Sequence, residues 1–203
     1  MNRMVIVAAF AIALSGCLSV ETEISLSDDG SGRMDMVYTI DREFYELGVF
    51  DNSDMALPIP VSEAEFREAV RLHEGLRLRR YRSREEENSI VIEVRLEFES
   101  VEALSAWYGG SEEGGEAITL EAAGGRTVWH QLLYPGDGAD GEIAEALGES
   151  LEGYALSYTL RPPREVVSAT PGVVSSGRKE ATISIGLDEI VRAVEPVFWD
   201  VRW

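Results

Sequence analysis

The feature of this sequence that most restricts its fold is an alternation of apolar and polar residues on both sides of one turn. Residues 20–26 place an apolar or β-branched side chain at every second position, and residues 34–40 do the same. The segment between them, SDDGSGR, is rich in Asp, Ser and Gly. Period-two patterns that flank such a cluster are typical of a β-hairpin with one buried face.

Two helices are indicated by their N-terminal signals. The segment SEAEFREAVRLHEG begins with a capping box, in which Ser62 accepts from the backbone of Glu65 and the Glu65 side chain reaches back. Its apolar face follows the spacing i, i+3, i+4 and i+7, with Phe66, Ala69, Val70 and His73. Gly75 is a suitable residue at which to end this helix. Ser100 caps a second, shorter helix in the segment VEALSAWY.

The middle of the chain repeats the order strand, strand, helix. Residues 76–83 and 89–98 form a second hairpin pattern before the shorter helix. Residues 116–123 and 126–134 form a third, which a helical pattern in residues 140–153 follows. The repetition concerns the pattern alone, because the three units share no residue-level repeat.

The last residues return to strand patterns and complete the predicted fold. In the final segment, PVFWDVRW, the side chains of Val197, Trp199, Val201 and Trp203 share one face, which predicts a docked terminal strand. The fold class that we predict is α+β, with a largely antiparallel β-sheet built of strand-strand-helix units and about three helices packed on one face.

The N-terminus forms a separate unit. Arg3 supplies a positive charge, residues 4–14 are continuously apolar, and Ser15 and Gly16 are small. This arrangement is typical of a secretory signal peptide. The apolar run is shorter than the roughly 20 residues of a membrane-spanning helix. No later segment is long and apolar enough either, so we expect no transmembrane helix in the mature chain.

The lone cysteine follows this unit directly. The sequence Leu14-Ser15-Gly16-Cys17 resembles the lipobox of bacterial lipoproteins. In that family the cysteine sulfur receives a diacylglycerol, and the signal is cut just before it. The resemblance implies a cleaved signal peptide at residues 1–16, cleavage between Gly16 and Cys17, and a single lipid-anchored domain at residues 17–203. The alternative is an ordinary secretory signal with an incidental cysteine.

A lipidated Cys17 would make the membrane a partner of the protein. One acyl chain gives only reversible binding, at roughly 0.8 kcal/mol per buried methylene, whereas two or three chains make attachment stable. The resemblance therefore implies export and anchoring to a bacterial cell membrane, facing the periplasm or the exterior. Leu18 follows the cysteine, where enteric bacteria use Asp as an inner-membrane retention signal. An outer membrane, where one exists, is thus permitted as the destination.

The charge and the single cysteine exclude several classes of protein. The chain carries 18 Lys and Arg against 37 Asp and Glu, a net charge of −19. Such a surface repels phosphate backbones, so we expect no nucleic-acid partner. One cysteine cannot form a disulfide within the chain.

The acidic turn and the two histidines do not match known metal sites. Counted from Asp28 or Asp29, the twelfth residue of an EF-hand loop would be Thr39 or Ile40, and neither supplies the required glutamate. His73 and His130 share no metal-ligand spacing. We expect no bound metal ion and no cofactor.

The sequence contains no motif of a known catalytic site. It lacks a G-x-S-x-G elbow, a phosphate-binding G-x-x-x-x-G-K-[ST] loop and a second cysteine. Its many acids form carboxylate pairs by chance, so none can be singled out for glycoside hydrolysis. We therefore expect no enzymatic activity, with a hydrolase as the less favoured alternative.

Aromatic residues supply the remaining candidate site. Trp107 with Tyr108, and Trp199 with Trp203, are expected in the core or along a groove for an apolar ligand. A domain tethered at a membrane with such a groove would suit a lipid-like ligand.

The order of elements is similar to the LppM-type lipoprotein domain. Its members begin with a lipidated cysteine, a strand and a hairpin turn, matched here by Cys17 and residues 20–32. Residues 81–104 and the segment LRPPREVVSATPGVVSSGRKEATISI match later parts. The resemblance implies an envelope protein that handles lipid-like ligands, and it assigns no catalytic residue. We predict a non-catalytic binding domain for envelope proteins, with a carrier or sensor of a lipid-like ligand as the alternative.

Overall fold

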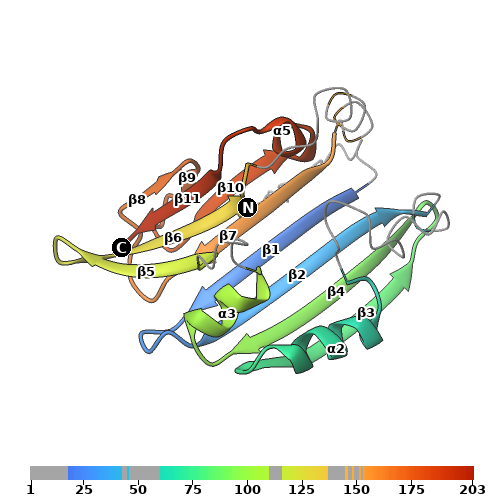
Figure 1. Cartoon of the computed structure of the whole chain (residues 1–203), viewed down its shortest axis with the longest axis horizontal. Helices are drawn as coiled ribbons and strands as arrows, with labels where there is room; N and C mark the ends of the chain where they lie inside the picture. Colours follow the sequence, from blue (N-terminus) through green and yellow to red (C-terminus); the bar gives the residue numbers. More distant parts are fainter. Residues whose placement is uncertain are drawn as a thin grey trace, which may run out of the picture.

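The described strands of this protein form two sheets (Figure 1). The computed structural model describes residues 18–42, 45, 60–109, 116–136, 145, 148, 151 and 153–203. The larger sheet contains, in the order in which the strands pair, β3 (Leu76–Glu85), β4 (Ser89–Phe98), β2 (Gly32–Asp41), β1 (Leu18–Leu26), β7 (Ala155–Arg161), β10 (Ala181–Gly186) and β9 (Val173–Val174). The smaller sheet contains β5 (Ile118–Ala123), β6 (Arg126–Tyr134), β11 (Val197–Arg202) and β8 (Ser168–Thr170).

The three predicted hairpins are confirmed. Strands β1 and β2 are antiparallel, with Val20 opposite Tyr38 and Ile24 opposite Met34. Strands β3 and β4, and β5 and β6, are antiparallel in the same way. In β2 every second side chain from Met34 onward is buried, so the alternation read from the sequence defines the inner face.

The arrangement of the hairpins differs from the single sheet that we predicted. Strand β7 pairs with β1 in parallel, with Tyr158 opposite Thr22, and it joins the first two hairpins to β10 and β9. The third hairpin instead pairs with β11 in the second sheet. Alternation reports which side chains of a strand are buried, but it carries no information on which distant strand becomes its neighbour.

Three helices are described, and two of them begin as predicted. They are α2 (Glu63–Leu72), α3 (Val101–Trp107) and α5 (Leu187–Arg192). The Ser62 hydroxyl accepts from the Glu65 N–H at 3.3 Å, and the Glu65 carboxylate accepts from the Ser62 N–H at 2.8 Å, which completes the capping box. Ser100 caps α3 by accepting from the Ala103 N–H at 3.2 Å.

The core lies between the inner face of the larger sheet and a layer made of α2, α3 and the smaller sheet (Figure 1). Ile24, Met34 and Leu160 are fully buried on the sheet, and Phe66 of α2 and Leu104 of α3 are fully buried against it. From the smaller sheet the core receives Trp129, Trp199 and Val201. The terminal strand β11 is therefore docked, as predicted.

The outer face of the larger sheet is charged. Asp35 accepts from Arg95 of the neighbouring strand at 2.6 Å and pairs with Arg33 at 2.7 Å. Arg161 of β7 pairs with Glu23 of β1 and with Glu180. Partly exposed pairs of this kind contribute about 0–1 kcal/mol each, but opposite charges across strands favour this register.

Several predicted features lie outside the described residues. These are the signal peptide at residues 1–16, Cys17, and most of the helix expected at residues 140–153. The third strand-strand-helix unit is therefore observed only in its strands, β5 and β6. Within the described ranges, no helix reaches the length and hydropathy that a membrane span requires.

Candidate functional site

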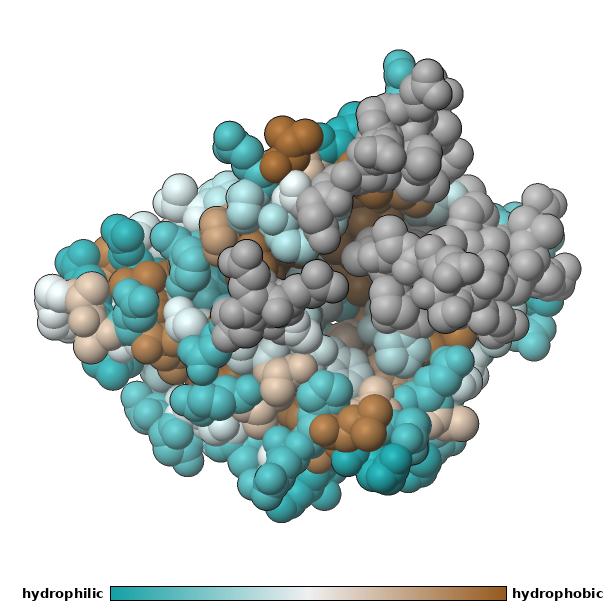
Figure 2. All heavy atoms as spheres, in the orientation of Figure 1, coloured by the Kyte–Doolittle hydropathy of each residue, from teal (hydrophilic) through white to brown (hydrophobic). Residues whose placement is uncertain are grey.

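A pocket of about 460 Å³ lies between the larger sheet and the two helices that cover it. The sheet contributes Val20, Thr22, Met36, Tyr38, Leu156 and Tyr158 to its lining. The helices and their ends contribute Ala69, His73, Trp107 and Tyr108. On this face of the molecule, Figure 2 shows apolar residues within a central hollow and mostly hydrophilic residues along the rim beside α2. The volume and the largely apolar lining match those of small-molecule sites.

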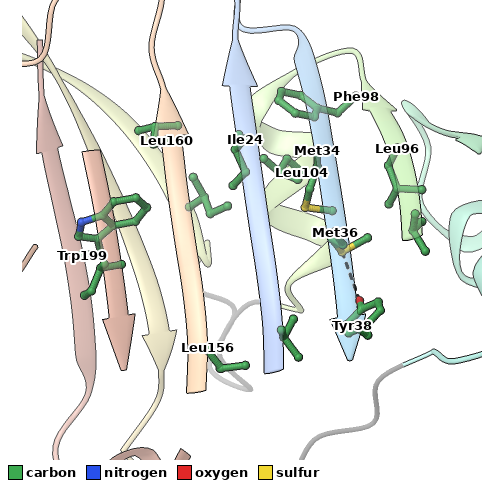
Figure 3. Packing of buried hydrophobic residues seen from close by; sticks show 14 of the residues in the cluster. Ile24, Met34, Met36, Tyr38, Leu96, Phe98, Leu104, Leu156, Leu160 and Trp199 are labelled. Atoms are coloured by element: carbon green, nitrogen blue, oxygen red, sulfur yellow. Dashed lines mark hydrogen bonds between the residues drawn. The ribbon is translucent and has the colours of Figure 1, made fainter. Parts of the chain in front are cut away.

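Within the described part of the chain, two tyrosine hydroxyls of the pocket donate to methionine sulfur and to no other acceptor. The Tyr38 hydroxyl donates to Met36 Sδ at 3.3 Å, a bond drawn in Figure 3 along β2. The Tyr108 hydroxyl, which follows α3, donates to Met34 Sδ at 3.2 Å. Thioether sulfur is a weak acceptor, so both hydroxyls keep most of their hydrogen-bonding capacity.

The third tyrosine has no such bond. Among the described residues, the Tyr158 hydroxyl has no hydrogen-bond partner, although its ring lies 6.4 Å from the ring of Tyr108 and 6.5 Å from that of Trp199, between centroids. The three phenols converge from β2, β7 and the end of α3. Together with the polar groups of Thr22, His73 and Trp107, they are the polar side-chain groups of the described lining.

Burial keeps these phenols uncharged. It raises the pKa of Tyr158 to about 12. Burial, with a further contribution from Tyr158, also raises the pKa of Tyr38 and that of Tyr108 well above the usual value for a phenol. In this part of the molecule a negative charge is therefore poorly solvated.

The helical wall of the pocket is held by ring contacts. Trp107 stacks on Phe66 with centroids 6.2 Å apart and an interplanar angle of 10°, and it meets the edge of His73 at 6.0 Å. His73 Nδ1 lies 2.7 Å from the Ala69 carbonyl oxygen. Because a carbonyl only accepts, this nitrogen carries a proton.

The aromatic residues predicted for a groove separate into two groups. Trp107 and Tyr108 line the pocket. Trp199 is fully buried behind it, against Tyr158, and Trp203 is buried at the end of β11, where its backbone pairs with Thr127. The predicted lipidation and cleavage residues, Cys17 and Gly16, lie outside the described residues.

Two residues of the pocket, Tyr38 and Tyr158, did not stand out in the sequence. Both occupy inward positions of alternating strands and therefore read as core. The sequence feature that could have identified them is a tyrosine hydroxyl at an inward position whose neighbouring inward positions carry Met, Leu or Ile.

Two other concavities have a different character. One of about 470 Å³ beside the β1–β2 turn is lined by Arg33, Arg77, Glu97 and Glu99, and Arg77 pairs with Glu99. Another of about 630 Å³ runs along β10 and α5, and its described lining includes no aromatic side chain. Neither combines apolar walls with converging hydroxyls.

The acidic turn forms a closed hairpin turn. Asp29 Oδ1 accepts from the backbone N–H of Ser31 at 3.0 Å and from its hydroxyl at 2.7 Å. The bond from the Ser31 hydroxyl, and then that from its N–H, lower the pKa of the Asp29 carboxyl. The described residues contain no cluster of three or more His, Cys, Asp and Glu side chains able to hold a metal ion.

The second histidine belongs to a surface pair. His130 Nδ1 lies 2.5 Å from Asp200 Oδ1, and the His130 ring stacks on Phe198 at 4.6 Å. Both members of the pair are about one-third exposed or more, on the outer face of the smaller sheet. The pair lies on a different sheet from the pocket described above.

Comparison with solved structures gives a likeness of fold. No protein-family model matches the sequence, and no curated protein matches it. The NMR structure of the folded domain of LppM from Mycobacterium tuberculosis is similar to this structure, with a TM-score of 0.48 and 10% sequence identity. The match covers 92% of this chain and 89% of that chain. It concerns the overall fold alone, and it assigns no ligand and no site residue to this protein.

Proposed function

We propose that this protein binds a lipid-like apolar ligand in the pocket between the larger sheet and helices α2 and α3. The observation that carries the proposal is an apolar space of about 460 Å³ bordered by Trp107, Tyr38, Tyr108 and Tyr158. Burial of an aliphatic chain there would contribute roughly 0.8 kcal/mol per methylene. From the sequence this was the alternative to a protein-interaction module, and the pocket now favours it.

An interaction module has less support. It would be expected to expose a contiguous apolar patch. The most exposed apolar side chains, Leu72, Val173 and Val194, belong instead to the end of α2, to β9 and to the segment after α5. Apolar residues scattered singly over a surface are normal and indicate no partner.

We further propose that a lipidated Cys17 anchors the protein to a membrane of the bacterial cell envelope. The pocket would then bind its ligand beside that membrane. Strand β1 begins at Leu18, and its residues Val20 and Thr22 line the pocket. At about 3.3 Å per residue, Val20 lies roughly 10 Å along the chain from the proposed anchor. A ligand that exchanges with the membrane would have only a short distance to travel.

The proposed role is non-enzymatic. Among the described residues, the lining contains no carboxylate and no Ser or Cys, and its Thr22 hydroxyl forms no hydrogen bond with His73. A phenol with a raised pKa is a poor base near neutral pH. Transport or sensing of a ligand requires neither group.

The direct test fills the pocket and compares the result with a matched change outside it. Ala69 lines the pocket, whereas Ala64 on the same helix is exposed. In the full chain carrying Cys17→Ser, an apolar naphthylamine dye should bind, and Ala69→Phe should weaken binding at least tenfold. Ala64→Phe should leave binding unchanged. Both variants contain the same N-terminal segment, so a difference between them reports the pocket.

Lipid extraction and native mass spectrometry of the same protein form the second arm. A co-purified apolar molecule that is absent from Ala69→Phe would support the proposal. Equal dye binding by folded Ala69→Phe and Ala64→Phe would overturn it. Circular dichroism establishes that each variant is folded.

A further inference from the structure

The three phenols of the pocket are more polar than packing requires. Phenylalanine at Tyr38, Tyr108 and Tyr158 would fill nearly the same space without burying a hydroxyl. A tyrosine that serves the fold usually finds a strong acceptor when buried. Tyr81 does so here, since its hydroxyl donates to the Val61 carbonyl at 2.7 Å. The pocket tyrosines have sulfur acceptors or, among the described residues, none.

These hydroxyls can both donate a hydrogen bond to a ligand and accept one from it. A phenol donates one hydrogen bond and accepts others. Tyr38 and Tyr108 donate to Met36 and Met34, and a better acceptor would displace these weak bonds. The Tyr158 hydroxyl has no partner among the described residues, and its ring lies 6.4 Å from that of Tyr108, tilted by 55°. An oxygen-containing group of a ligand would therefore meet several donors together.

The described lining of the pocket offers no lysine or arginine to balance an anion. Its imidazole, that of His73, donates Nδ1–H to the Ala69 carbonyl. The chain as a whole carries a net charge of −19. A carboxylate or phosphate would lose its water without gaining a cation, which is unfavourable, whereas an uncharged oxygen is not penalised in this way.

We infer that the pocket selects an apolar molecule with an uncharged hydrogen-bonding head, a hydroxyl or an ester, and that Tyr38, Tyr108 and Tyr158 are its specificity-determining residues. This inference rests on the proposed function and adds the chemical class of the ligand. It distinguishes fatty alcohols and esters from fatty acids and phospholipid-like anions of the same chain length.

Competition against the naphthylamine dye tests the inference at pH 8, in the full chain carrying Cys17→Ser. The probes are 1-dodecanol, methyl dodecanoate, dodecanoate and dodecyl phosphate, of which the last two are ionised at this pH. We expect the alcohol and the ester to compete at least tenfold more strongly than the two anions. Equal or stronger competition by either anion would overturn the inference.

Tyrosine variants identify the groups responsible. Tyr158→Phe, and the double change Tyr38→Phe with Tyr108→Phe, keep the apolar walls and remove only hydroxyls. The preference for alcohol over dodecanoate, measured as the ratio of the two competition constants within each variant, should fall at least fivefold. Tyr81→Phe, outside the pocket, is the matched control and should keep the preference. An unchanged preference in both pocket variants would overturn the assignment to these residues.

The two proposals fail in different ways. If the dye does not bind, or if Ala69→Phe does not weaken it, the proposed binding function is wrong. If the dye binds in the pocket and no head-group preference exists, only the selectivity for uncharged ligands is wrong.

Discussion

Phe66 and Trp107 stack on each other with ring centroids 6.2 Å apart and an interplanar angle of 10°. Phe66 is the buried residue of α2, and Trp107 is the last residue of α3. Their contact joins the two helices that form one wall of the pocket. The pocket therefore depends on a pair of side chains from helices that are separated by the β3–β4 hairpin.

Truncation of Phe66 should destabilise the protein strongly. Phe66 has no exposed surface and contacts Tyr38 and Tyr81 as well as Trp107. Phe66→Ala should lower the free energy of unfolding by about 3–5 kcal/mol, as for other large core residues. Leu72→Ala, at an exposed position of the same helix, should change it by less than about 0.5 kcal/mol. Urea unfolding followed by circular dichroism measures both, and similar effects at the two positions would contradict this account of α2 docking.

Removal of single hydroxyls should separate structural tyrosines from pocket tyrosines. Tyr81→Phe loses a bond to the Val61 carbonyl and should cost about 1 kcal/mol. Tyr158→Phe loses no described bond, so its free energy of unfolding should stay the same or rise slightly. The comparison uses chemical denaturation of the ligand-free protein. A larger loss for Tyr158→Phe than for Tyr81→Phe would mean that the Tyr158 hydroxyl has a structural role.

Alkaline pH should destabilise the fold through the same phenols. The pKa of Tyr158 rises from 10 in the unfolded chain to about 12 in the folded protein because of burial. The contribution of neutral Tyr158 to the free energy of unfolding is fully present below pH 10. It is lost as the pH rises from 10 to 12, because the tyrosine of the unfolded chain ionises first. Within that pH range, each such tyrosine lowers the free energy of unfolding by roughly 1.4 kcal/mol per pH unit. Chemical denaturation at a series of pH values gives the free energy of unfolding as a function of pH, and its slope should be shallower for Tyr158→Phe. Identical slopes for the two proteins would refute the raised pKa of Tyr158.

Calcium should have little effect on stability. The carboxylate of Asp29 already accepts two hydrogen bonds from Ser31 within the β1–β2 turn. Thermal unfolding in millimolar calcium chloride should match unfolding in magnesium chloride of equal ionic strength. A rise in Tm specific to calcium would show that the acidic turn binds the ion.

Substitution of Cys17 should abolish attachment to the membrane. Cells that express the natural chain should incorporate labelled palmitate into it, and Cys17→Ser should prevent incorporation and move the protein out of the membrane fraction. Ser15→Ala keeps a small residue before the cysteine and should preserve labelling. Labelling that persists in Cys17→Ser would refute the anchor.

Local elements of this fold could be predicted from the sequence because their causes are local. The alternation around SDDGSGR identified the β1–β2 hairpin, and Ser62 with Glu65 identified the start of α2. A strand needs only a period of two, and a helix cap needs only residues three positions apart. The sequence also offered Trp107 with Tyr108, and Trp199 with Trp203, as core or groove residues, of which the first two lie in the pocket lining and the last two are buried.

The pairing of distant elements was decided only in the tertiary structure. The parallel contact of Thr22 with Tyr158 puts β7 in the middle of the larger sheet, and the third hairpin joins β11 in the smaller one. Which distant strands pair depends on how the faces of the sheets and helices pack against one another, and the hydrophobic periodicity of a single strand does not specify it. The same packing places Tyr38 and Tyr158, which the sequence pattern assigned to the core, beside Tyr108 in the lining of a pocket. The sequence by itself determined the elements and their buried faces. The tertiary structure decided which of the buried residues line an open space. The reason is that such a space forms only where separate layers do not pack fully against each other.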